Sequence, residues 1–160
     1  MAMARVPAAQ RRRMSSEELA VWRSLVDTTD ELRRLLSAQL AEDSQLSPGD
    51  YAVLLALSEA EGRRLRSSEL AATMDWERSR LSHHLGRMEK RGLIAREDCV
   101  TDNRGAEVLM TEEGASAFRG ATTPHTRAIK RHFADALSPA QFDALRDVLQ
   151  SINEHLREAN

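Results

Sequence analysis

The sequence of 160 residues lacks most of the features that mark secreted or membrane proteins. It has one cysteine, Cys99, which excludes an internal disulfide bond. It has only six aromatic residues, and no apolar run approaches the ~18 residues that cross a membrane. The N-terminus carries no apolar core of a signal peptide. We therefore expect a cytoplasmic protein without a membrane partner.

Motifs of enzymes are missing as well. We find no Gly-rich phosphate loop, no paired carboxylates and no HExxH sequence. Cys99 has no cysteine-hydrolase signature around it, and a lone cysteine at a strand end is more often a small buried hydrophobe. His125 and His132 are seven residues apart on a predicted helix, too far for one metal ion. We expect no catalytic residue, metal or cofactor, and only a redox-sensing role for Cys99 stays open.

The residues that are present suit a helical protein with segregated charge. Apolar residues make up 41% of the chain, and with few aromatics the core must rely on Leu, Ala and Val. The net charge is −2, but residues 63–91 hold eight Lys/Arg against four Asp/Glu, so this stretch carries +4 and the rest −6. Because phosphate attraction is local under physiological screening, this stretch can face a polyanion although the whole chain is acidic.

The centre of the chain predicts a short helix, a turn, a second, basic helix and a two-stranded hairpin. Ser67 is the expected N-cap of the short helix, residues 69–74. Asp75 is the expected N-cap of the second helix, which runs from about residue 76 to residue 91 and is followed by Gly92 at the C′ position. Only a few residues separate the helices, as a helix-turn-helix requires.

The second helix has two different faces. Leu81, Leu85 and Met88 recur at four and then three residues and predict one buried stripe. Small, hydrogen-bonding and cationic side chains occupy the opposite face and its edges, namely Ser79, Arg80, Ser82, His83, Gly86, Arg87 and Lys90. Such a face can enter a DNA major groove, where Arg binds guanine and Ser or His reaches base edges. An ordinary solvated helix face is the alternative.

The hairpin is predicted from two β-compatible runs, residues 93–96 and 107–110, with a turn-rich segment between them. A short strand at residues 63–66 is expected to complete its sheet. Arg104 is at the hairpin tip, with Asp102 close enough in sequence to brace its guanidinium. An arginine there can enter a minor groove, where narrow A·T tracts concentrate negative potential. A surface ion pair is the alternative.

Together these features resemble the winged helix-turn-helix of the MarR (multiple antibiotic resistance regulator) family. Short motifs within residues 50–114 carry the resemblance: Glu69-Leu70-Ala71, Ser82, Leu85, Met88-Glu89, Gly92-Leu93, Arg96, Asp102, Arg104, Leu109 and Thr111-Glu112-Glu113-Gly114. No single motif is specific, but the set is. The resemblance implies a mainly α fold with a small β-hairpin wing and with N- and C-terminal dimerisation helices.

On this prediction the chain has four parts. They are a flexible arm at 1–14, an N-terminal dimerisation helix at 15–46, a winged helix-turn-helix DNA-binding lobe at 47–111, and C-terminal dimerisation helices at 112–160. Capping signals predict helix starts after Ser15, Ser47, Thr111 and Ser138. The helix after Ser47 is apolar on most sides and should be the buried centre of the lobe. Pro124 is expected to kink or restart the helix after Thr111.

Apolar stripes in the first and last helices have no partner segment left in the chain. The stripe of the last helix recurs at spacings of three and four, with Phe142, Leu145, Val148, Leu149, Ile152 and Leu156. The stripe of the first helix runs from Leu19 to Leu40. We therefore expect a homodimer, whose recognition helices would lie about one DNA turn apart on a near-palindromic operator of double-stranded DNA.

The resemblance also implies a small effector, often anionic or phenolic, bound between the dimerisation helices and the DNA-binding lobe. Trp22, Arg23 and Tyr51 are on helices that could line such a pocket. His84 flanks the buried stripe of the recognition helix and could couple a bound molecule or a proton to the position of that helix. Core packing is the alternative for all four. Ala52 is aligned with the Asp of urate-responsive members, which argues against urate.

The sequence thus predicts a ligand-released transcriptional regulator, a repressor rather than an activator. The residues expected to approach the major groove are Ser79, Ser82, His83, Arg87 and Lys90. Arg104 is expected in the minor groove, and Arg80 and Arg78 at phosphates. An ion pair within the fold is the alternative for Arg78. Two other interpretations stay open: a winged-helix dimer that binds a protein partner, and a DNA-coating protein without sequence preference.

Overall fold

The computed structural model describes residues 13–98 and 106–159. The chain forms two compact units, Met1–Arg34 and Leu35–Asn160. Helix α1 (Ser16–Ser44) begins in the first unit and ends in the second. Among the described residues, none of the helices has the length and apolar character needed to cross a membrane.

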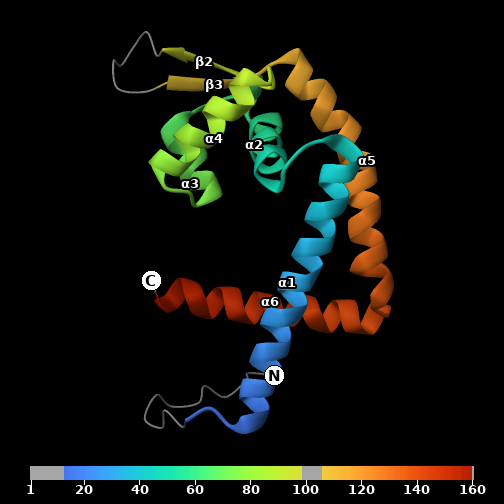
Figure 1. The fold of residues 1–160 in the computed structure, drawn as a ribbon. Helices are drawn as coiled ribbons and strands as arrows, with labels where there is room; N and C mark the ends of the chain where they lie inside the picture. Colours follow the sequence, from blue (N-terminus) through green and yellow to red (C-terminus); the bar gives the residue numbers. More distant parts are fainter. Residues whose placement is uncertain (1–12, 99–105, 160) are drawn as a thin grey trace. The chain divides into compact units, whose positions relative to one another are not determined.

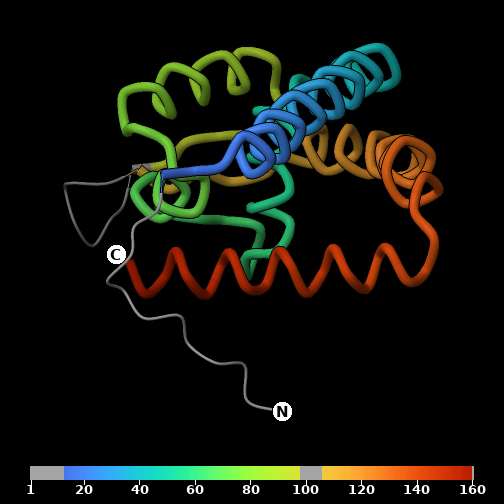
Figure 2. Tube along the Cα trace, turned by 90° about the horizontal axis from the view of Figure 1, so that it is seen from below, coloured from blue at the N-terminus to red at the C-terminus, as the bar shows by residue number. Residues whose placement is uncertain are grey.

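The second unit holds the other helices and a small sheet (Figure 1). In chain order these are α2 (Pro48–Glu59), η1 (Glu61–Arg63), β1 (Arg64–Arg66), α3 (Ser67–Met74), α4 (Arg78–Lys90), β2 (Ile94–Asp98), β3 (Ala106–Met110), α5 (Glu112–His132), η2 (Ala134–Ala136) and α6 (Pro139–Ala159). Figure 2 follows the trace from α5 through a short turn into α6. The predicted fold, mainly helical with a small wing, is confirmed.

The sheet has the strand order β1-β3-β2, with both pairings antiparallel. Val108 in the central strand is opposite Leu65 in β1 and Arg96 in β2, and its side chain is buried. The hairpin of β2 and β3 and the short strand before α3 are therefore as predicted, with strand ends that differ by one or two residues.

One apolar core joins α2, α3 and α4 to the sheet. Its buried members are Leu40, Leu46, Val53, Leu54, Leu57, Leu70, Ala71, Leu81, Leu85, Met88, Leu93, Ile94, Val108 and Ala121. The three residues from α2 confirm that this helix is the buried centre of the lobe. Burial of each large apolar side chain stabilises the fold by roughly 1.5–3 kcal/mol, so α4 is held firmly by one face.

Four helix starts are confirmed by capping hydrogen bonds. Three are reciprocal boxes in which a serine hydroxyl accepts from the backbone N–H three residues on, whose side chain accepts from the serine N–H: Ser15–Glu18, Ser47–Asp50 and Ser138–Gln141. In the fourth, Thr111 Oγ1 accepts from the Gly114 N–H at 2.9 Å. These local signals were sufficient to locate the helix starts.

Ser67 is not the N-cap of the first helix in the helix-turn-helix. It is the first residue of α3, and Arg66 is at the cap, with its N–H donating to Glu69 Oε2 at 3.0 Å. The Ser67 hydroxyl instead donates to the carbonyl of Ala106 in β3 at 2.9 Å. The hydroxyl therefore ties α3 to the sheet, because a partner 39 residues away competes with the local cap.

Asp75 is not the N-cap of the second helix. It is the C-cap of α3 in the left-handed conformation, with φ +51°, and its N–H donates to the Ala72 carbonyl at 3.2 Å. Aspartate adopts this conformation more readily than most residues. Helix α4 consequently begins at Arg78, later than predicted, after Glu77, which makes no capping bond through its side chain. Gly92 has φ +74°, as a C′ glycine should.

Pro124 does not restart a helix. Helix α5 continues through the proline and ends at its C-cap, Phe133. Ala121 and Ala128 are buried on either side of the proline. Packing of these two turns outweighs the loss of one backbone hydrogen bond, so the local helix-breaking tendency is overridden.

Candidate nucleic-acid interface

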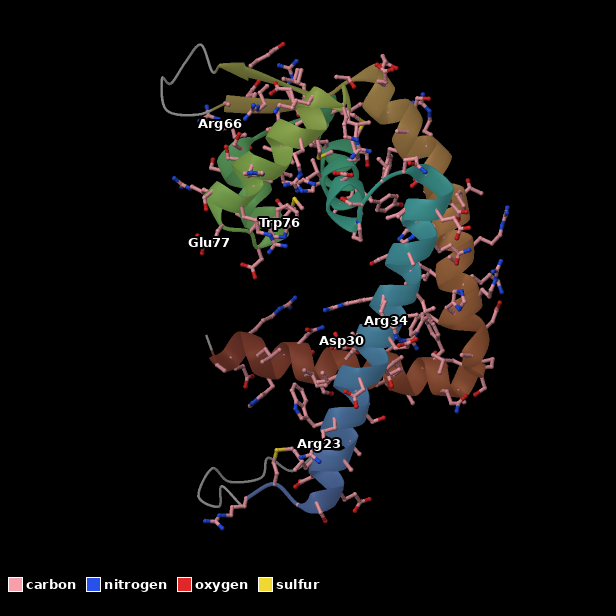
Figure 3. All side chains as sticks on the ribbon, in the orientation of Figure 1. Arg23, Asp30, Arg34, Arg66, Trp76 and Glu77 are labelled. Carbon is pink, nitrogen blue, oxygen red and sulfur yellow. The ribbon has the colours of Figure 1, made fainter. Side chains whose placement is uncertain are left out.

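Helix α4 has the two faces that its spacing predicts. Leu81, Leu85 and Met88 are buried in the core. The side chains predicted to face DNA are exposed: Ser79, Arg80, Ser82, His83, Arg87 and Lys90. Figure 3 labels Trp76 and Glu77 in the turn that leads into this helix. The residues predicted to approach the major groove are therefore all on one exposed face of α4, and the opposite face of this helix is buried in the core.

The tip of the wing lies outside the described residues. Cys99, Asp102 and Arg104 belong to that tip, and their expected roles remain predictions. The strands that lead to the tip are described, and they pair as far as Asp98 and Ala106.

Arg87 is exposed, yet its guanidinium is held by two histidines of its own helix. One terminal nitrogen lies 3.0 Å from His83 Nδ1 and the other lies 2.9 Å from His84 Nδ1. A guanidinium has only donors, so both imidazole nitrogens must accept. The orientation of Arg87 is therefore set by two imidazole acceptors of its own helix.

Asp50 at the start of α2 is a buried carboxylate with three partners. Its Oδ2 accepts from the Ser47 N–H at 2.9 Å and from Arg91 at 2.7 Å. Its Oδ1 lies 3.0 Å from His84 Nε2, an ion-pair distance without the alignment of a hydrogen bond. Burial acts to raise the pKa of Asp50, but the bonds from Ser47 and Arg91 outweigh it and hold the pKa below its usual value.

Arg91, at the C-cap of α4, joins this helix to the segment between α1 and α2. Its second terminal nitrogen donates to the Gln45 carbonyl at 2.7 Å. Gln45 has φ +61°, a left-handed conformation that costs a non-glycine residue free energy. The two hydrogen bonds of Arg91, one to Asp50 and one to Gln45, thus fix the C-terminal end of α4 against the start of α2.

Trp76 and Gly49 both lie against the ring of His84. The Trp76 ring packs edge-on against His84 with centroids 5.2 Å apart, and the Arg80 guanidinium lies 4.4 Å from its centroid. A Cβ on Gly49 would lie 2.8 Å from His84 Cε1, so any larger residue there would force the His84 ring to shift. An open depression of about 560 Å³ is lined by Gly49, Trp76, Ser79, Arg80, His83, His84 and Arg87.

An ion pair between Glu89 of α4 and Arg96 of β2 attaches the wing to α4. Glu89 Oε2 accepts from Arg96 Nε at 3.0 Å and from a terminal nitrogen at 2.6 Å, and Oε1 accepts from the Arg96 N–H at 3.1 Å. The hydrogen bonds from Arg96 hold the pKa of Glu89 below its usual value. Glu89 and Arg96, both among the residues that carry the family resemblance, thus have a structural role, which is to fix β2 relative to α4.

The four residues proposed for an effector pocket have different surroundings. Trp22 and Arg23 are exposed in the first unit, where Figure 3 labels Arg23. Tyr51 is half-buried and packs against Phe118, with ring centroids 5.2 Å apart. His84 is 8% exposed and belongs to the Asp50 network. Tyr51 and His84 therefore have separate sets of contacts in the second unit.

His125 is an aromatic neighbour of Tyr51. Their ring centroids are 4.7 Å apart, and burial lowers the pKa of His125. Among residues 13–98 and 106–159, no group of three or more His, Cys, Asp or Glu side chains could hold a metal ion.

Sequence reasoning named His84 but missed two other members of this network, the buried Asp50 and the exposed Arg91. A carboxylate on an otherwise apolar helix was a signal that it needs a cation. Its partners are 34 and 41 positions away, at His84 and Arg91, and no local pattern identifies them.

A helix-turn-helix with a basic, exposed second helix and an attached β-wing defines a winged-helix DNA-binding protein. Residues 44–105 match the sequence model of the MarR family. A comparison with curated proteins finds no significant match. Comparison with solved structures identifies relatives over almost the whole chain.

Sco3205, a MarR family transcriptional regulator from Streptomyces coelicolor solved in complex with DNA, is 36% identical over 91% of this chain and 91% of its own, with a TM-score of 0.83. AbsC, a MarR family transcriptional regulator from the same organism, is 39% identical over 92% of this chain and 99% of its own, with a TM-score of 0.77. The chain belongs to the MarR family of DNA-binding transcriptional regulators.

A more distant relative shares the fold alone. BpsR of Bordetella bronchiseptica, whose DNA binding is regulated by 6-hydroxynicotinic acid, is 18% identical over 84% of this chain and 98% of its own, with a TM-score of 0.71.

Proposed function

We propose that this regulator binds a near-palindromic operator as a homodimer and represses the genes beside it. The observation that carries the proposal is α4, a helix locked in the core by one face and bearing serine, histidine and arginine on the other. In the proposed complex Arg87 binds a guanine edge in the major groove. The neighbouring contacts there come from Ser79, Ser82, His83 and Lys90. Arg78 and Arg80 hold phosphates, which position the helix without reading sequence.

The wing supplies a second contact in this proposal. Arg104, with Asp102 beside it in sequence, enters the minor groove next to the half-site read by α4. The Glu89–Arg96 pair supports this arrangement, because it fixes β2 to α4 and so limits where the wing can point.

The homodimer is supported by the apolar stripe of α6. No residue of this helix is buried within the chain, and five of its large apolar side chains are between 42% and 54% exposed: Phe142, Val148, Leu149, Ile152 and Leu156. A contiguous apolar patch of this kind marks an interaction site. A second copy of the chain is the proposed partner, because a two-fold contact buries the same patch on both copies.

A small anionic or phenolic effector is proposed to release the DNA. Such a molecule acts on BpsR, where it is 6-hydroxynicotinic acid. It would act here by binding more tightly to a dimer whose lobes are wrongly spaced for the operator, a population shift of a few kcal/mol. Tyr51 is the first residue to vary in testing this, because it is half-buried beside Phe118 and His125.

The test is a binding titration with the DNA immediately upstream of the gene for this chain. Fluorescence anisotropy would compare that duplex with a scrambled duplex of equal composition at two salt concentrations. We expect at least roughly tenfold tighter binding to the upstream duplex, with both affinities falling as salt rises. Arg87→Ala and Arg104→Ala should each weaken specific binding by about tenfold. Arg119→Ala, at an exposed arginine of α5, is the matched control.

Two outcomes would contradict the proposal. Equal affinity for both duplexes would indicate a DNA-coating protein. Absence of binding to either duplex, with a dimer present, would favour a protein-interaction module that uses the same basic face.

A further inference from the structure

Three side chains connect the buried start of α2 to the exposed face of α4. Asp50 Oδ1 lies 3.0 Å from His84 Nε2, and His84 Nδ1 lies 2.9 Å from a guanidinium nitrogen of Arg87. Asp50 and His84 are buried, with 4% and 8% of their surfaces exposed, whereas Arg87 is exposed. The contacts therefore lead from the core to a side chain that is placed to meet DNA.

The tautomer of His84 follows from the chemistry of its partners. The guanidinium of Arg87 can only donate, so His84 Nδ1 accepts and carries no proton. The proton of the neutral ring is then on Nε2, which faces the Asp50 carboxylate. A carboxylate beside one ring nitrogen stabilises the tautomer that is protonated there. Asp50 is in turn held by Ser47 and Arg91.

We propose that Asp50 and His84 are positioning residues for DNA recognition. Asp50 selects the His84 tautomer that accepts from Arg87, and His84 aims the Arg87 guanidinium before DNA arrives. This rests on the proposed function, in which Arg87 contacts a base edge. A free arginine loses much rotamer freedom on binding, and an arginine held in advance loses less. Preorganisation therefore tightens binding without adding a contact to DNA.

The ring of His84 can orient Arg87 because its neighbours prevent it from turning easily. Trp76 packs against one side, and Gly49 approaches so closely that a Cβ there would lie 2.8 Å from His84 Cε1. The charged groups that face the ring are Asp50 from α2 and Arg80 and Arg87 from α4. His83 accepts from the other nitrogen of Arg87 but is exposed.

A double-mutant cycle on the full chain tests the proposal. Binding to the upstream duplex is measured by fluorescence anisotropy for wild type, His84→Gln, Arg87→Ala and the double variant. Glutamine can reach Asp50 but places no acceptor at the Nδ1 position. His84→Asn is the conservative control, because its carboxamide oxygen lies near the Nδ1 position. Circular dichroism and thermal melting establish that each variant is folded at the assay temperature.

We expect His84→Gln to weaken binding about five- to tenfold in wild type and less than about twofold beside Arg87→Ala, because its effect passes through Arg87. His84→Asn should stay within about threefold of wild type, since the acceptor is restored. Equal losses in both backgrounds, or no loss in His84→Gln, would overturn the proposal. If Arg87→Ala binds like wild type, the proposal fails although DNA binding stands. If wild type does not prefer the upstream duplex, the proposed function fails with it.

Discussion

Helices α4 and α6 carry apolar stripes of the same kind, with residues repeated at three and four positions, yet the two stripes have opposite surroundings. In α4 the stripe of Leu81, Leu85 and Met88 is buried against α2, α3 and the sheet. In α6 no residue of the stripe is buried, and all its members except the half-buried Leu145 are exposed. The ring of Phe142 is tilted against that of Phe133, with centroids 6.0 Å apart. A spacing pattern therefore identifies the apolar face of a helix, but not whether the chain itself buries that face.

The polar faces of the two helices differ as well. On α4, side chains are fixed by partners far along the chain, as in the contacts of Arg91 with Asp50 and of Glu89 with Arg96. On α6, the polar contacts are between neighbours of the same helix, such as Arg146 with Asp143. Long-range partners hold α4 in place relative to α2 and β2, whereas the polar side-chain contacts of α6 leave it tied only to itself and its N-cap in the described part of the chain.

The largest expected effect concerns the α4 stripe. Leu85→Ala should lower the free energy of unfolding by about 2–5 kcal/mol, because it removes buried methyl groups and leaves a cavity. Urea denaturation followed by circular dichroism measures it. Leu85→Met, which conserves volume, is the control and should cost less than about 1.5 kcal/mol. An unfolding midpoint for Leu85→Ala equal to that of wild type would show that α4 is not held by this stripe.

The α6 stripe should respond in association rather than in folding. Ile152→Lys places a charge in the proposed dimer contact and should raise the dimer dissociation constant by roughly 30-fold or more. Sedimentation velocity over a range of protein concentrations measures it. Gln150→Lys makes a similar change on the opposite side of the helix and should leave association within about twofold. Equal dimer dissociation constants for Ile152→Lys and Gln150→Lys would mean that the apolar stripe of α6 is not the dimer interface. The exposed stripe of α6 would then need another explanation.

The helix starts and the apolar faces could be predicted from sequence because their causes are local. Capping boxes at Ser15, Ser47 and Ser138 need only residues three positions apart, and the predictions there were correct. The assignments of Ser67 and Asp75 were wrong for two different reasons. Ser67 forms a tertiary bond to β3 instead of a cap, whereas Asp75 ends the preceding helix α3 in the left-handed conformation, which is a competing local role.

The exposed half of the candidate site was predicted from periodicity, but the buried half was not. Residues that point away from the core on α4 follow from the helical repeat alone. The partnership of Asp50 with His84 and Arg91 depends on how α2 packs against α4, and nothing in the spacing encodes that register. The grouping of Tyr51 with His84 in an effector pocket was inferred from the helices that carry them, and it stays a prediction.

The close approach of the His84 ring to Gly49 can be tested by adding one methyl group. Gly49→Ala favours the helix by up to about 1 kcal/mol, but its Cβ would press on His84 and Trp76. We expect a change in the free energy of unfolding of less than about 1.5 kcal/mol, with a several-fold loss of specific DNA binding. Gly120→Ala in α5, where a Cβ meets nothing within 4 Å, is the control and should leave DNA binding unchanged. Full DNA affinity in Gly49→Ala would show that the position of His84 is not tightly constrained.

The smallest expected effect is on the pH dependence of stability. It comes from His84, a residue of α4. Burial lowers the pKa of His84 below its ordinary value of 6.5, Asp50 only partly offsets this, and Arg87 lowers it further. Between the folded and unfolded pKa values the unfolded chain therefore binds more protons, so stability falls as pH drops below about 6.5. Urea denaturation at a series of pH values should show this slope, reduced in His84→Asn and unchanged in Gln150→Lys. Part of the slope should survive in His84→Asn, because burial also lowers the pKa of His125. An identical slope in wild type and His84→Asn would mean that His84 gains its proton as easily in the folded chain as in the unfolded one, which its contacts with Arg87 and the core oppose.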